Sequence, residues 1–167
     1  MNSFQTTQWY AIHTKPRQED RASTNLATLG IEILAPRIPV KKMNPGFEPL
    51  FPGYIFARFS IDHMLKKVRF TRGVSGVVSF GGLPSAVEDG VIVSIKEQTD
   101  QRGIIRSTTD IVPGDKLLIV DGPLRNFAGL FERELPASMR IRILLTTIAF
   151  SARIEVSKVD VIRLGSA

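Results

Sequence analysis

Stretches of alternating apolar residues and stretches with helical spacing follow one another through the first part of the chain. A period of two is typical of a strand, and a spacing of three or four residues is typical of a helix. The pattern predicts strands at residues 9–13, 31–38 and 54–59, a turn into a strand over 71–80, and a short extended return at 83–87. It predicts helices at residues 15–29, 62–70 and 88–98, and a loop at 39–49. We therefore expect an α+β fold of the split βαβ kind, a ferredoxin-like sheet with helices on one face.

The residues at the helix ends support these boundaries. Pro16 is tolerated in the first turn of a helix, and Gly30 suits a C-terminal cap. Asp62 can cap the second helix, and Glu88 and Asp89 suit the positive end of the third helix dipole. These carboxylates are therefore interpreted as helix-start residues rather than as general acids.

The strand at 54–59 carries aromatic residues on both of its faces. Parity places Ile55, Ala57 and Phe59 on one face and Tyr54, Phe56 and Arg58 on the other. If helices cover one face, the other offers an apolar surface with a phenol and a guanidinium, which suits docking to a large partner. The alternative is that both faces are core, because apolar strand residues are usually structural.

The pattern changes after Ile111, where short strands alternate with glycine and proline turns. Strands are predicted at residues 116–120, 126–131, 139–145, 148–156 and 159–164, with turns at 113–115 and 121–123. A helix through the second turn would cost about 1 kcal/mol for Gly122 and about 3 for Pro123. We expect a small β-barrel at residues 112–167, joined by a linker at 103–111 to an N-terminal domain at 1–102.

The composition is that of an ordinary globular protein with a basic excess. The chain is 43% hydrophobic and 23% charged, has no cysteine, and carries a formal net charge of +6. No apolar run reaches the roughly 20 residues that span a bilayer, and the start of the chain lacks the pattern of a signal peptide. We expect a cytoplasmic protein with no membrane partner, and the charge indicates a polyanion such as nucleic acid.

Residues with catalytic or metal-binding chemistry form no recognisable constellation. His13 and His63 lie in different elements, and neither has the spacing of a metal-ligand pair. Gly81 and Gly82 fit a hairpin turn better than a phosphate-binding loop. We therefore expect no enzymatic activity, no cofactor and no metal.

Basic residues gather at the start of the first predicted helix and in one turn. Lys15, Arg17 and Arg21 lie at the helix start, and Arg72 lies in the turn before a strand. Flexible cations suit phosphate contacts, and Gln18 could reach a base edge. The alternative is an ordinary solvated helix face.

Two motifs in sequence order carry a resemblance. Residues 50–56, Leu-Phe-Pro-Gly-Tyr-Ile-Phe, resemble the hallmark strand of the N-terminal domain of NusG-family transcription elongation factors. Residues 114–124, closing with Phe-Ala-Gly at 127–129, resemble a KOW motif. The resemblance spans residues 9–164, and residues 71–75 and 80–81 are more similar to the specialised RfaH branch than to the housekeeping factor.

The resemblance implies a factor without enzymatic activity that binds the clamp helices of RNA polymerase through an apolar patch. Such a factor suppresses pausing and, in the specialised branch, termination. The residues carried over to the polymerase patch are Tyr54, Phe56, Phe80, His13 and Ile92.

In the RfaH branch, basic residues of the first helix and of a Thr-Arg turn read single-stranded nontemplate DNA. The matching residues are Lys15, Gln18, Arg21, Thr71 and Arg72, to which Arg17 adds a cation. Pro16 replaces a basic residue, so the preferred DNA sequence is expected to differ. His63 begins a segment that does not reproduce the family's second polymerase contact.

The resemblance also implies partners for the C-terminal KOW domain, namely ribosomal protein S10 or a termination factor. Its motif residues are Gly114, Asp115, Gly122, Pro123, Asn126 and Gly129. Asn126 stands where glycine is usual, and asparagine tolerates a left-handed backbone. In the RfaH branch this domain can fold as a helical hairpin, but Pro123 and the β-branched strands favour the barrel here. We expect a monomer.

One other function fits the same motifs. The chain could be an RNA- or ribosome-binding KOW protein that acts in translation or in transcription-translation coupling. That function requires the C-terminal half to dominate binding, and pull-downs with each domain would separate the two hypotheses.

Overall fold

The structure is a computed structural model that describes residues 6–39, 46–105, 110–135, 140–146 and 151–166. The chain divides into two compact units, Met1–Asp89 and Gly90–Ala167. The predicted domain limits at residues 102 and 112 stay a prediction. The described part of the chain holds α-helices and several antiparallel sheets, in agreement with the expected mixture of helix and strand.

The main sheet of the first unit has five strands. They are β1 (Gln8–Thr14), β2 (Glu32–Leu34), β5 (Tyr54–Phe59), β6 (Val74–Val77) and β9 (Ala86–Val87). The strand order is β2-β5-β1-β6, and β9 also pairs with β1. Every pairing is antiparallel, and the register places His13 opposite Tyr54 on β1 and β5.

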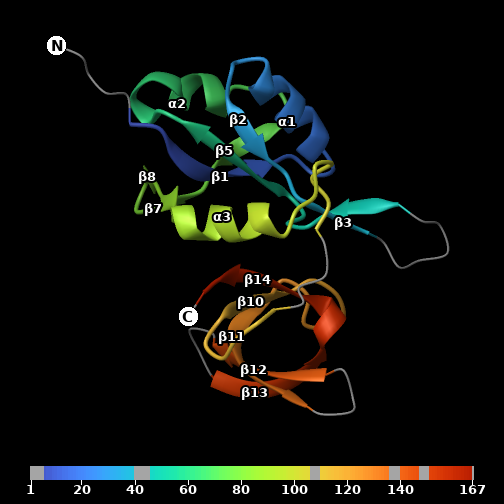
Figure 1. Cartoon of the computed structure of the whole chain (residues 1–167). Helices are drawn as coiled ribbons and strands as arrows, with labels where there is room; N and C mark the ends of the chain where they lie inside the picture. Colours follow the sequence, from blue (N-terminus) through green and yellow to red (C-terminus); the bar gives the residue numbers. More distant parts are fainter. Residues whose placement is uncertain (1–5, 40–45, 106–109, 136–139, 147–150, 167) are drawn as a thin grey trace. The chain divides into compact units, whose positions relative to one another are not determined.

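Helices α1 (Glu19–Ala27) and α2 (Ile61–Arg69) cover one face of this sheet (Figure 1). Ala22, Leu26 and Val68 are fully buried against the strand residues Ile55 and Ala57. The predicted inward face of β5 is therefore confirmed, and Ala22 and Leu26 form the packing face of α1.

Two small hairpins flank the main sheet. β3 (Arg37–Pro39) pairs with β4 (Phe47–Pro49), and β7 (Ser79–Phe80) pairs with β8 (Leu83–Pro84). The turn between β7 and β8 is formed by Gly81 and Gly82, both with positive φ, as predicted for a hairpin. Helix α3 (Asp89–Glu97) follows β9, and its Ile92 and Ile95 are buried.

Several predicted boundaries are wrong. Helix α1 begins at Glu19, not at the predicted Lys15, because Arg17 has a φ of 58° that a right-handed helix does not accept. The predicted strand at 31–38 is two strands, and β4 (Phe47–Pro49) forms within the predicted loop and pairs with β3. Asp62 is not the N-cap of α2, since Ser60 occupies that position.

The second unit contains a five-stranded antiparallel sheet in the order β13-β12-β11-β10-β14, which curves around its own core (Figure 1). The strands are β10 (Lys116–Ile119), β11 (Ala128–Leu135), β12 (Arg140–Thr146), β13 (Ser151–Ser157) and β14 (Val161–Gly165). A single 3₁₀ turn, η1 (Lys158–Asp160), precedes β14. Leu117, Phe131 and Ile143 are buried in the core. Five strands form after Pro113 as predicted, but β11 begins at Ala128 rather than Asn126 and runs to Leu135, and residues 159–160 belong to the 3₁₀ turn. Met139 and residues 148–150 lie outside the described residues.

The segment predicted as a linker is structured where it is described. Ile104 and Ile105 are buried, and Ile105 forms an isolated bridge with Thr99. The Asp100 carboxylate accepts hydrogen bonds from the backbone N–H groups of Arg102 and Ile104 at 2.8 and 3.0 Å. Residues 106–109 of the predicted linker lie outside the described residues.

Candidate functional site

An exposed aromatic pair lies at the end of β1. The rings of His13 and Tyr54 stack with centroids 5.0 Å apart and planes inclined by 21°. Both side chains are exposed, Tyr54 to 42%. Stacking on a neighbour fixes the orientation of a ring that is otherwise open to solvent. The pair is therefore a preorganised apolar contact surface on the sheet face away from α1 and α2.

The turn before β5 holds this pair in place. Gly53 accepts a hydrogen bond from Thr14 N–H and donates one to Glu19 Oε1, both at 2.8 Å. Its φ is +82°, and a Cβ at this position would lie 4.0 Å from the His13 ring. A glycine is needed here because the backbone is left-handed.

The other residues predicted for the polymerase patch differ in their exposure. Phe80 is 77% exposed at the tip of the β7–β8 hairpin, opposite Leu83, which is 74% exposed. Phe56 is only 7% exposed and contacts Phe51 edge to face, with centroids 5.4 Å apart. Ile92 is 2% exposed. The face expected to be open is therefore open at Tyr54 but closed at Phe56.

Hydrogen bonds to backbone carbonyls bring the two predicted basic segments together. Lys15 N–H donates to Gly73 O at 2.8 Å, and the Asn25 side chain donates to Arg72 O at 3.1 Å. The turn after β1 and the turn after α2 thus lie side by side, although they are far apart in sequence. We call Lys15, Arg17, Gln18, Arg21, Thr71 and Arg72 the basic surface.

The cations of the basic surface point into solvent. The exposed ones are Lys15, Arg17, Arg21 and Arg72, while Gln18 and Thr71 are half-buried. A shallow depression of about 340 Å³ is lined by Asp20, Arg21, Thr24, Asn25 and Arg72. The nearby carboxylates have other partners: Asp20 pairs with Arg37 at 3.5 Å, and Glu19 accepts from Gly53. The surface therefore keeps a positive excess that suits phosphate groups.

Close packing at Gly73 fixes the relative position of the two turns. Its φ is +91°, and a Cβ there would lie 2.8 Å from the backbone nitrogen of Ala22. Only glycine combines this backbone conformation with such close approach of a helix.

The motif residues of the second unit build the two ends of β10. The buried Asp115 carboxylate accepts from Val112 N–H at 3.0 Å, and Gly114 N–H donates to Phe131 O at 2.8 Å. Asn126 has a φ of 72°, so the left-handed backbone predicted for this asparagine is confirmed. These residues shape loops, and nothing in their contacts suggests chemistry.

The described residues hold no group of histidines and carboxylates that could bind a metal ion. Burial and the nearby Asp62 raise the pKa of the Tyr10 hydroxyl, and the N–H of Ile104 holds the pKa of Asp100 below its ordinary value. Both shifts belong to structural contacts and not to a site. Residues that sequence reasoning missed are Phe51, Leu83 and Phe70, which only their exposure or packing reveals.

Comparison with known proteins decides the family. The family described as "Transcription termination factor nusG" matches residues 7–96, more than half of the chain. The chain belongs to the NusG family. Two NusG relatives, both named "Transcription termination/antitermination protein NusG", come from Thermus thermophilus and Deinococcus radiodurans. Each is 24% identical to this chain; the matches cover 93% and 89% of this chain and 98% and 94% of the relatives.

A solved structure is similar over nearly the whole chain. It is described as "Domain interaction in Thermotoga maritima NusG", with a TM-score of 0.50 and 22% identity. The match covers 95% of this chain and 98% of that one, and it concerns the fold alone. No helix in the described ranges is long and apolar enough to cross a membrane.

Proposed function

We propose that this NusG-family chain is a transcription elongation and antitermination factor of the RfaH-like branch, without enzymatic activity. The observation that carries the proposal is the position of the aromatic pair and the basic surface beside each other. His13 belongs to the aromatic pair, and Lys15, two residues later in the chain, belongs to the basic surface. The end of β1 and the turn that follows it therefore offer a protein-binding and a phosphate-binding surface next to each other.

The aromatic pair is proposed to dock on the clamp helices of RNA polymerase. Tyr54 and His13 present a fixed apolar area, and Phe80 adds a second exposed ring on its hairpin. Aromatic side chains are typical energetic centres of protein interfaces. The burial of Phe56 and Ile92 does not favour direct contact in this state, so we assign Phe56 a supporting role beside Phe51.

The basic surface is proposed to hold the single-stranded nontemplate DNA of the transcription complex. Arg21 and Arg72 flank one depression, and Lys15 and Arg17 extend the positive charge along the turn. These cations would mainly contact phosphate groups, so the affinity for DNA should fall steeply as the salt concentration rises. Gln18 is the candidate for a base-edge contact.

Simultaneous binding explains how a factor without catalysis could suppress pausing. Once the aromatic pair is docked, the basic surface meets the DNA strand as an intramolecular event with a high effective concentration. The strand is then held in one place, and rearrangements that lead to pausing or termination become less favourable. Each individual contact can remain weak.

The second unit is proposed to be a KOW domain that recruits ribosomal protein S10 or a termination factor. The strands β10 to β14 of this unit surround a core, which supports a constitutive barrel as the resting state. Far-UV circular dichroism of the full chain tests this point. A helical excess well beyond the content of α1, α2 and α3 would contradict it.

The docking step is tested by capture of purified RNA polymerase with Tyr54→Ala, Phe80→Ala and the double variant. We expect each single variant to weaken capture and the double variant to lose most of it. Leu29→Ala is the matched control, since Leu29 is 40% exposed and lies in the turn after α1, outside the aromatic pair. Unchanged capture by the double variant would show that the docking surface is elsewhere.

A further inference from the structure

Phe70 is exposed without a structural reason. Its side chain is 80% exposed, more than any other large hydrophobic residue among those described. It occupies the C-cap position of α2, where its backbone N–H donates to Lys66 O at 3.2 Å. Any residue could make that backbone bond, and the inward face of α2 is already filled by Val68. The phenyl ring itself therefore contributes almost nothing to the fold.

The surroundings of Phe70 are strongly basic. On the helix, Lys66 and Lys67 lie four and three residues before it, the spacings at which side chains become neighbours. Arg69 comes directly before Phe70 and Arg72 two residues after it, and all four cations are exposed. Cations suit the C-terminal end of a helix dipole, which explains part of this charge but not the ring among it.

A groove of about 500 Å³ ends at the ring. Its lining consists of Ile61, Asp62, His63, Leu65, Lys66, Arg69 and Phe70. Asp62 is the one carboxylate in that lining. The occupant that fits an aromatic ring among cations is a flexible polyanion with flat apolar faces, which is the chemistry of single-stranded nucleic acid.

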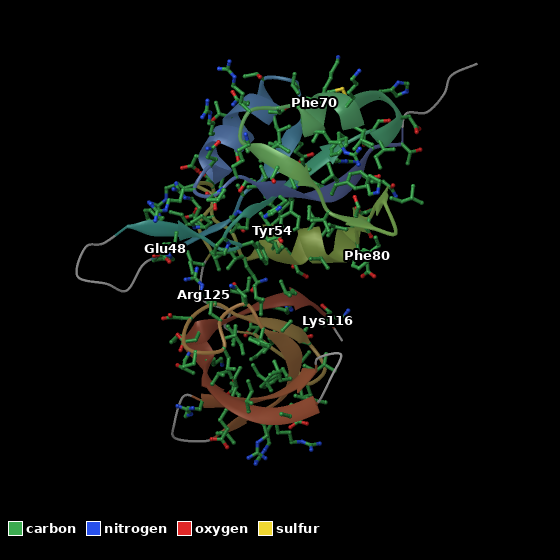
Figure 2. The ribbon with its side chains drawn as sticks, turned by 180° about the vertical axis from the view of Figure 1, so that it is seen from behind. Glu48, Tyr54, Phe70, Phe80, Lys116 and Arg125 are labelled. Atoms are coloured by element: carbon green, nitrogen blue, oxygen red, sulfur yellow. The ribbon has the colours of Figure 1, made fainter. Side chains whose placement is uncertain are left out.

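We propose that Phe70 is a stacking platform for a base of the single strand that the basic surface holds. The inference rests on the proposed DNA contact, because Thr71 and Arg72 of that surface follow Phe70 directly in the chain. Figure 2 shows Phe70 on the side of the first unit away from Tyr54 and Phe80. A strand bound at Arg72 can therefore reach Phe70 without passing over the proposed polymerase surface.

The test measures fluorescence anisotropy of a fluorescein-labelled single-stranded DNA oligonucleotide with the full-length chain over a series of salt concentrations. We expect Phe70→Ala to weaken binding by at least about five-fold, the lower range for loss of one stacked base. Phe70→Trp should retain binding, because it keeps a stacking surface. Phe47→Ala is the matched control, since Phe47 is an exposed phenylalanine on β4, outside the basic surface and the proposed polymerase surface, and its loss should leave the affinity unchanged.

The salt dependence separates stacking from phosphate contact. Phe70→Ala should leave the slope of log affinity against log salt unchanged, whereas Arg72→Ala should reduce it by about 0.7, the value for one phosphate on a single strand. Unfolding curves followed by Trp9 fluorescence check that both variants fold.

Three results would overturn the proposal. If Arg72→Ala weakens DNA binding and Phe70→Ala does not, the stacking role is wrong while the DNA contact stands. If the unmodified chain does not bind the oligonucleotide, the DNA part of the proposed function fails and the stacking role fails with it. If Phe70→Ala keeps DNA affinity but loses polymerase capture, the groove binds protein instead.

Discussion

Replacing Gly73 by alanine should separate the two halves of the basic surface. Gly73 has a φ of +91°, and an added Cβ would meet the backbone of α1, 2.8 Å from Ala22 N and 3.1 Å from Ala22 Cα. A left-handed backbone costs a non-glycine residue roughly 1–2 kcal/mol. Overpacking against a backbone that cannot rotate away costs roughly 1–3 kcal/mol more. We therefore expect Gly73→Ala to lower the free energy of unfolding by about 2–5 kcal/mol.

Two other glycines separate the contributions. Gly30 has a φ of +76°, but a Cβ added there would have nothing within 4 Å, so Gly30→Ala should cost only the backbone term, about 1–2 kcal/mol. Gly76 has neither a positive φ nor a neighbour within 4 Å, so Gly76→Ala should change stability by no more than about 0.5 kcal/mol.

Urea unfolding followed by the fluorescence of Trp9 is the assay. Trp9 is the one tryptophan in the sequence and is 4% exposed in the first unit, so its emission reports on that unit. The predicted order of stability, from highest to lowest, is Gly76→Ala, then Gly30→Ala, then Gly73→Ala. If Gly73→Ala is as stable as Gly30→Ala, the contact with Ala22 does not constrain the turn and this reasoning is wrong.

Three further predictions concern the second unit. Gly129→Ala should destabilise it by about 1–3 kcal/mol, because the new Cβ would lie 2.7 Å from Leu144 O, while Gly165→Ala, with open space around it, should be nearly neutral in thermal unfolding followed by circular dichroism. Asn126→Ala should lower the stability of the second unit by about 1 kcal/mol, because alanine tolerates the left-handed backbone poorly, while Asn126→Gly should not lower it. Faster amide hydrogen exchange in β10 and β11 of Asn126→Ala alone would show this. The pKa of the Asp100 carboxyl lies below its ordinary value. The stability that this carboxylate gives the 100–104 turn is therefore fully present above the ordinary pKa and is lost as the pH falls through the lower pKa of the folded state. An NMR titration of Asp100 with an ordinary midpoint would contradict this.

The periodic parts of the fold could be predicted from sequence, because period and face are local properties. The alternation in β5 indicated the correct inward face, with Ile55, Ala57 and Phe59 buried. The left-handed Asn126 was also predictable, since few residues other than glycine accept that conformation. These features depend on neighbours two to four residues away.

The features that sequence reasoning missed depend on contacts between distant segments. Phe56 is buried beside Phe51, a residue of an irregular turn with no period to indicate its direction. Arg17 is left-handed within a turn that bonds to Gly73, so the start of α1 is fixed by a remote segment. Ile104 and Ile105 form too short an apolar run to show a period, and only the folded chain reveals their burial.

For the candidate site, the sequence supplied the residues and the structure supplied their grouping. Composition and motif assigned Lys15 and Arg72 to the same kind of contact, but the hydrogen bond from Lys15 N–H to Gly73 O is what brings their turns together. Phe70 carried no signal in the sequence, because an aromatic residue after a helix is usually packed.

The proposed function is tested most directly by transcription in vitro with purified RNA polymerase on a template that carries a pause site and a terminator. The account predicts shorter pauses and more read-through when the unmodified chain is added, weaker effects with Tyr54→Ala, and loss of both effects with the double variant Tyr54→Ala/Phe80→Ala. Unchanged pausing and termination with the unmodified chain, or full activity of Tyr54→Ala, would contradict it.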